Sequence, residues 1–138
     1  MVDPAQHTPE LACFNHISQA TTLRATYHLP ALHGFGTLAD HPENYAGVIV
    51  LGSGASVYDG YPWQTQLHGW LRKVMDHGVP TLGICYGHQA IAHIYGGRIG
   101  LLYDGEKAKG TRDIRFKCDR LNVRDQTGKM VVSHREGI

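Results

Sequence analysis

A strand, a sharp turn and a helix follow one another directly around Cys85, and this succession constrains the fold more than any other feature. Residues 79–84 have the apolar character of a short strand, and a helical pattern continues over 90–95 until two glycines end it. Gly83 and Gly87 flank the cysteine. This is the cysteine form of the G-x-S-x-G turn, in which small neighbours allow a strained backbone to hold a nucleophile out of the sheet. The start of the next helix favours the thiolate form, so we predict that Cys85 is a nucleophile.

A second strand and helix precede this one. Residues 46–51 form a continuous apolar run that ends at Gly52, which is typical of a strand covered on both faces. Large apolar residues then recur at helical spacing, and Gly78 closes the helix; they are Trp63, Leu67, Trp70, Leu71, Val74 and Met75. Strands that alternate with helices predict an α/β fold with a mostly parallel sheet and helices on both faces.

The N-terminal third gives weaker signals. We expect residues 1–9 to be a loose leader, 11–15 to form a short strand and 17–26 to form a helix. Two prolines and two glycines predict irregular structure over 27–44.

The pattern changes after the second helix. Residues 98–102 read as a strand, and 113–118 alternate apolar with charged side chains, as a half-exposed antiparallel strand does. Residues 129–133 are a further strand. We therefore expect antiparallel strands toward the C-terminus.

Composition excludes several classes of function. A net charge of +1, with 18% charged residues, gives no electrostatic basis for binding nucleic acid or membrane. No apolar run reaches spanning length, and the first residues are polar. The three cysteines are far apart, which indicates free thiols in a reducing, cytoplasmic setting. The ten histidines are scattered without metal-ligand spacing, so no metal is expected.

The seven residues Gly83-Ile84-Cys85-Tyr86-Gly87-His88-Gln89 closely resemble the nucleophile motif of class I glutamine amidotransferases. The resemblance extends over residues 47–138 and implies a flavodoxin-like domain. It implies that Cys85 attacks the side-chain amide of glutamine, that water hydrolyses the thioester, and that ammonia passes to a synthase. No cofactor is implied. The Gly-Ser-Gly sequence at 52–54, followed by Tyr58-Asp59 and Pro62-Trp63, resembles the stand-alone, GMP-synthase-like branch.

The loop after the strand predicted at 46–51 can serve as an oxyanion site or as an ordinary Gly-Ser turn. In the family a Gly-Gly-Pro loop stands here, and aligning Ser56-Val57-Tyr58 places Gly52 and Ser53 on the two glycines and Gly54 on the proline. The resemblance then implies oxyanion donors at the Ser53 and Tyr86 N–H groups. It also implies that Gly52 and Gln89 bind substrate. The alternative to a substrate-binding role is that Gln89 is an ordinary residue on the helix surface.

A cysteine nucleophile needs a base and an orienting group. His88 follows Cys85 by three residues, but the start of a helix points this position away, so we treat it as structural. His134 and Glu136 have the spacing of the family's His-Pro-Glu motif without its proline, and they resemble a separate Ser-His-x-acid segment. We therefore expect residues 1–138 to be a single domain that lacks its C-terminal part and hydrolyses glutamine poorly or not at all.

Three alternatives stay open. A γ-glutamyl hydrolase would use the same nucleophile. A PfpI-type hydrolase usually has histidine directly after the cysteine, where this chain has Tyr86. A non-catalytic binding domain could keep the turn around Cys85 and lack the rest of the triad.

Overall fold

The computed structural model describes residues 1–38, 41–102, 106, 108–118 and 123–138. The chain divides into two compact units, one of residues 1–99 with Ile138 and one of residues 100–137. No helix in the described ranges is long and apolar enough to cross a membrane.

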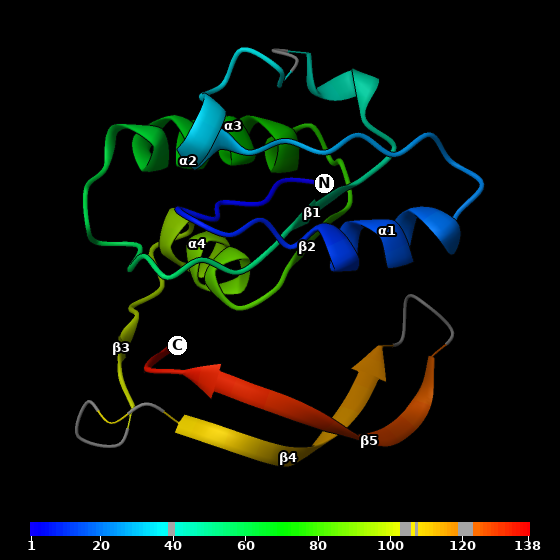
Figure 1. The fold of residues 1–138 in the computed structure, drawn as a ribbon, viewed down its shortest axis with the longest axis vertical. Helices are drawn as coiled ribbons and strands as arrows, with labels where there is room; N and C mark the ends of the chain where they lie inside the picture. Colours follow the sequence, from blue (N-terminus) through cyan, green and yellow to red (C-terminus); the bar gives the residue numbers. More distant parts are fainter. Residues whose placement is uncertain (39–40, 103–105, 107, 119–122) are drawn as a thin grey trace. The chain divides into compact units, whose positions relative to one another are not determined.

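Two short parallel strands lie at the centre of the first unit (Figure 1). β1 (Val48–Val50) pairs with β2 (Thr81–Gly83), with Val48 opposite Thr81 and Val50 opposite Gly83. Both strands fall within predicted apolar runs, and their parallel pairing is confirmed. Because neighbouring parallel strands end at one edge, the segments after Val50 and Gly83 leave the sheet side by side.

The N-terminal segment extends this sheet. Val2 forms parallel bridges to His28 on one side and to Val50 on the other. Its N–H donates to the Ile49 carbonyl at 2.8 Å, and its carbonyl accepts the Leu51 N–H at 2.9 Å. Val2 is 1% exposed, and the next three residues are also buried. The expectation of a loose leader is therefore wrong for residues 1–5, because these backbone groups complete the hydrogen bonding of β1.

The next segment also differs from expectation. Residues 11–15 belong to a helix, α1 (Leu11–Gln19), and the helix expected over 17–26 ends at Gln19. Asp3 accepts the Glu10 N–H at 2.7 Å, and this bond satisfies a backbone donor at the helix start. No residue of α1 is fully buried, and its apolar Cys13, Phe14 and Ile17 are only half-buried. The short helices α2 (Pro30–His33) and η1 (Pro42–Asn44) interrupt the stretch predicted to be irregular.

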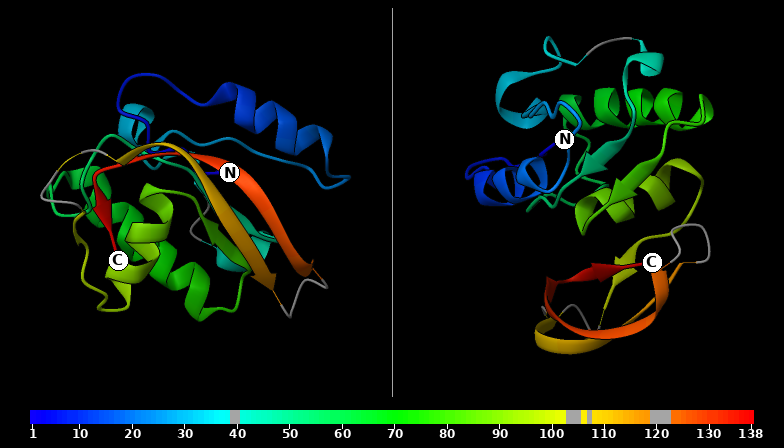
Figure 2. Two further views of the ribbon diagram at one scale, coloured as in Figure 1. Left: turned by 90° about the horizontal axis from the view of Figure 1, so that it is seen from below. Right: turned by 90° about the vertical axis from the view of Figure 1, so that its right-hand side faces the viewer.

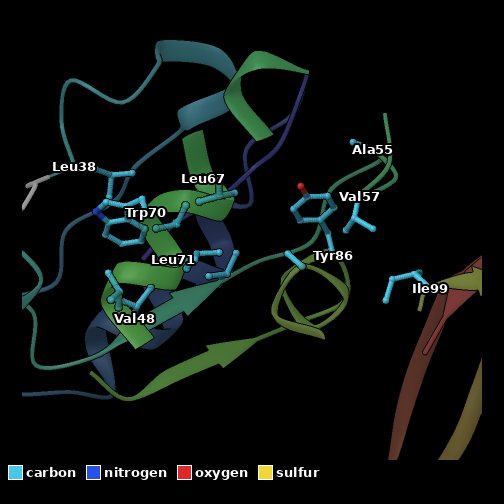
Figure 3. Close-up of a cluster of buried hydrophobic side chains, with 13 residues drawn as sticks. Leu38, Val48, Ala55, Val57, Leu67, Trp70, Leu71, Tyr86 and Ile99 are labelled. Carbon is cyan, nitrogen blue, oxygen red and sulfur yellow. The ribbon is translucent and has the colours of Figure 1, made fainter. Parts of the chain in front are cut away.

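The hydrophobic core lies between β1, α3 (Pro62–Asp76) and the first turn of α4 (Tyr86–Ile94) (Figure 3). Both helices were predicted, and α4 begins at once after the turn. The apolar stripe of α3 supplies most of the buried side chains, namely Leu67, Trp70, Leu71 and Val74. Figure 3 shows the Tyr86 ring beside the loop residues Ala55 and Val57. The core thus packs directly behind the turn that carries Cys85.

The second unit is antiparallel, as expected for this part of the chain. β4 (Ala108–Cys118) pairs with β5 (Val123–His134), and the register shifts between Phe116 and Cys118. Figure 2 shows this pair as a long, twisted ribbon. β3 (Gly100–Leu101) pairs with β6 (Glu136–Gly137), also antiparallel. The fold class is therefore α/β, with parallel strands in one unit and antiparallel strands in the other.

Candidate active site

Cys85 lies in a strained turn between β2 and α4. Its backbone has φ 52° and ψ −108°, and among the described residues it is the only non-glycine with positive φ. Such conformations cost about 1–3 kcal/mol and persist only where the surrounding structure holds them. The thiol is free and exposed. The turn therefore presents the sulfur to solvent at the start of a helix, as predicted for a nucleophile.

Two glycines allow this turn because the backbone passes too close to its neighbours for any side chain. A Cβ added to Gly83 would lie 2.5 Å from the carbonyl oxygen of Gly87. A Cβ added to Gly87 would overlap the Val50 carbonyl and lie 2.8 Å from the Val50 Cβ. The G-x-C-x-G spacing thus has a steric cause: α4 starts against the ends of both β1 and β2.

The loop after β1 lies next to the nucleophile. A Cβ built on Gly52 would lie 3.5 Å from the Cys85 Cβ and 3.9 Å from its sulfur. The Leu51 carbonyl accepts the Gly87 N–H at 3.2 Å, which ties this loop to the first turn of α4. These are ordinary van der Waals distances, so the backbone at Gly52 lies directly against the Cys85 side chain.

The two expected oxyanion donors belong to these adjoining segments. Tyr86 is the first residue of α4, so its N–H has no intrahelical acceptor. The Ser53 hydroxyl donates to the Pro4 carbonyl at 2.8 Å and accepts the Ala55 N–H at 3.2 Å. The Ser53 side chain thus fixes its loop, and its backbone N–H stays the predicted donor.

A buried polar group that the sequence analysis missed lies behind the turn. Tyr86 is 0% exposed, and its hydroxyl lies 3.2 Å from Gln64 Nε2 and 3.1 Å from His68 Nε2. The His68 ring in turn lies 5.4 Å from the His93 ring. Helix α3 therefore contacts the residue after the nucleophile through polar atoms as well as apolar ones.

The protonation states in this group follow from burial. Burial, with a smaller contribution from the Asp59 carboxylate, raises the pKa of Tyr86 to about 12, so the phenol keeps its proton. Burial and then the nearby His93 lower the pKa of His68, which is therefore neutral at pH 7. Since Gln64 donates to the phenol oxygen, the phenol proton is available to a neutral His68 Nε2.

The other candidate residues that the sequence suggested belong to α4, β5 and β6. Gln89 is one turn into α4 and 7% exposed, and its N–H donates to the Cys85 carbonyl at 3.1 Å. His88 is exposed. His134 ends β5, and its side chain lies outside the described residues, while Glu136 begins β6. The substrate-binding role of Gln89 and the identity of the base stay predictions.

One sequence signal could have found Gln64. It stands three residues before Leu67 and seven before Leu71, so it shares the buried face of an amphipathic helix. A polar residue on such a face needs internal hydrogen-bond partners. No group of three or more metal-ligating side chains occurs in the described part of the chain.

The sequence of this chain is similar to known proteins. Residues 16–138 match the family described as "Glutamine amidotransferase class-I". A GMP synthase [glutamine-hydrolyzing] of Thermomicrobium roseum is 49% identical over 53 residues, which are 38% of this chain and 9% of that protein. Gamma-glutamyl peptidase 4 of Arabidopsis thaliana is 35% identical over 57 residues, 41% of this chain and 23% of that protein.

The fold agrees with these matches. A crystal structure of a glutamine amidotransferase from Thermotoga maritima superposes with a TM-score of 0.74 and 19% identity, covering 99% of this chain and 60% of that one. The chain thus spans under two thirds of that structure and under a quarter of both curated relatives. From the match over residues 16–138, the chain belongs to the class I glutamine amidotransferase family.

Proposed function

We propose that this chain hydrolyses the side-chain amide of glutamine through a Cys85 thioester and supplies the ammonia to a synthase. One observation carries the proposal: an exposed thiol in a strained turn, with a helix start on one side and Gly52 on the other. A buried structural cysteine needs none of these features. Family membership supports glutamine as the substrate class.

The chemistry would proceed in two steps. The Cys85 sulfur attacks the amide carbon of glutamine, and the carbonyl oxygen becomes an oxyanion between the N–H groups of Tyr86 and Ser53. The C–N bond then breaks, and the nitrogen takes a proton and departs as ammonia. The γ-glutamyl group stays on the Cys85 sulfur as a thioester. Water then cleaves the thioester, which releases glutamate and restores the thiol. Gly52 and Gln89 would contact the substrate.

Both steps need a proton carrier, and general acid–base help is typically worth about 10²–10⁴-fold in rate. We propose that His134 is not this base, since His134-Arg135-Glu136 lacks the proline of the family motif. Replacing His134 with alanine should leave glutaminase activity unchanged. If this variant loses its activity while it stays folded, His134 is the base, with Glu136 as the orienting group.

We also propose the finer features that the sequence implied. These are a flavodoxin-like sheet with helices on both faces, a stand-alone GMP-synthase-like branch and a cytoplasmic setting. The last is supported by Cys13 and Cys85, which are both free thiols. The GMP synthase match supports a synthase as the ammonia acceptor.

The direct test is glutamate and ammonia release from glutamine by the purified chain, compared with Cys85→Ser. Cys13→Ser is the matched control, because Cys13 lies on α1 and outside the proposed site. We expect any activity of the parent to be weak, to persist in the control and to be lost in Cys85→Ser. Activity that survives in Cys85→Ser would refute the cysteine mechanism. Its absence from all three proteins would favour the non-catalytic alternative.

A second function is favoured by a specific observation, the match to gamma-glutamyl peptidase 4. A γ-glutamyl peptide presents a secondary amide at the same carbon, so the same thioester would form with release of an amine. Parallel assays with glutamine and a γ-glutamyl dipeptide would separate the two functions. A kcat/KM higher for the dipeptide would assign the chain to peptide hydrolysis.

A further inference from the structure

One buried amide joins the two segments that carry the expected oxyanion donors. Gln64 is 1% exposed and lies in the first turn of α3. Its Oε1 accepts the Tyr61 N–H at 2.9 Å. Its Nε2 donates to the Ser56 carbonyl at 2.6 Å and to the Tyr86 hydroxyl at 3.2 Å.

These bonds reach both sides of the nucleophile. Ser56 follows Ser53 by three residues in the same loop, and its N–H is held by Asp59 at 2.9 Å. The Ser56 peptide is thus fixed at its N–H by one side chain and at its carbonyl by Gln64. On the other side, the Tyr86 phenol anchors the residue whose N–H begins α4.

We propose that Gln64 is a positioning residue that holds the Ser53 loop and the Tyr86 N–H at the spacing an oxyanion needs. The inference rests on the proposed function, since the two N–H groups act only if Cys85 forms a tetrahedral intermediate. Oxyanion donors must stand at about 2.7–3.1 Å from the oxygen, and removing one typically costs about 10²–10³-fold in kcat. A shared anchor for both donors gives them one fixed geometry.

The proposal separates two reactions of the same sulfur. Acylation by p-nitrophenyl acetate forms an S–C bond at a carbonyl, develops an oxyanion and releases p-nitrophenolate. Alkylation by iodoacetamide displaces iodide at a saturated carbon and develops none. A residue that only supports the fold affects both rates alike. A residue that positions oxyanion donors affects acylation alone.

The test uses the full chain with Cys13 and Cys118 changed to serine, so that Cys85 is the only thiol. Gln64→Met keeps the length of the side chain and removes its polar atoms. Gln66→Met is the matched control, because Gln66 is an exposed glutamine of the same helix. We expect acylation of Gln64→Met to slow by about tenfold or more, with alkylation within about twofold of the parent and both rates unchanged in the control.

A second variant keeps the test decisive if Gln64→Met fails to fold. Tyr86→Phe keeps the backbone N–H and removes the hydroxyl that Gln64 holds, so the same selective loss of acylation is expected. Equal slowing of both reactions, or of neither, would overturn the proposal. A parent chain that is acylated normally but releases no glutamate from glutamine would refute the proposed function and still decide the role of Gln64.

Discussion

At the scale of single residues, backbone strain and exposure distinguish Cys85 from Cys13. Cys85 has an exposed sulfur and a left-handed backbone, whereas Cys13 is half-buried on α1. A thiol at a helix N-terminus meets unpaired N–H groups that stabilise the attacking anion. We therefore expect the reactivity of Cys85 to follow from its position in the fold.

We expect iodoacetamide to label Cys85 faster than Cys13 or Cys118 in the folded chain between pH 6 and 8. Mass spectrometry of the digested protein after short exposure would measure each rate. Labelling in urea is the control, because unfolding removes the difference in environment. Equal or slower labelling of Cys85 in the folded chain would contradict its role as the reactive thiol.

At the scale of elements, the sequence predicted the parts with strong local signals. The apolar runs that became β1 and β2 and the stripe of α3 were found because buried elements carry a clear period. The bridges of Val2 were missed because a single bridging residue has no period, and only its backbone bonds to β1 reveal them. A five-residue window cannot separate strand from helix, so α1 was read wrongly.

The candidate site also has a part that a local sequence pattern predicts and a part that depends on contacts between distant residues. The motif around Cys85 is contiguous, and the sequence alone predicted both its turn and the loop beside it. Gln64 and His68 contact Tyr86 across 22 and 18 positions of the chain. No local pattern reports such contacts, although the place of Gln64 on an apolar helix face is a usable signal.

Two glycines in helices provide a matched test of the packing around the turn. Gly87→Ala would overlap the end of β1, and overpacking costs about 1–3 kcal/mol of unfolding free energy. Gly69 in α3 has nothing within 4 Å of an added Cβ, so Gly69→Ala should stabilise by about 0.5–1 kcal/mol. Urea unfolding followed by tryptophan fluorescence would measure both. Equal effects in the two variants would contradict this account.

At the scale of the whole molecule, the buried His28 and the half-buried His68 link the stability of the first unit to pH. His28 is 8% exposed, and its ring nitrogens lie 2.8 Å from Thr26 Oγ1 and 3.0 Å from Thr37 Oγ1. Burial lowers the pKa of His28, and the positive N-terminus lowers it further by a smaller amount. Burial likewise lowers the pKa of His68, with a smaller contribution from His93. Both rings are therefore held in the neutral form by the folded chain.

The sign of the effect follows from linkage. Near its ordinary pKa of about 6.5, an unfolded histidine binds more protons than the folded one, so the unfolding free energy falls as the pH drops through this value. The fall should level off below the lowered pKa of the folded state. Urea unfolding at several pH values, followed by Trp63 and Trp70 fluorescence, measures the slope. His68→Gln should flatten it, whereas His16→Gln, at an exposed position of α1, should leave it unchanged. A slope that His68→Gln does not alter would show that protonation of this ring does not oppose folding.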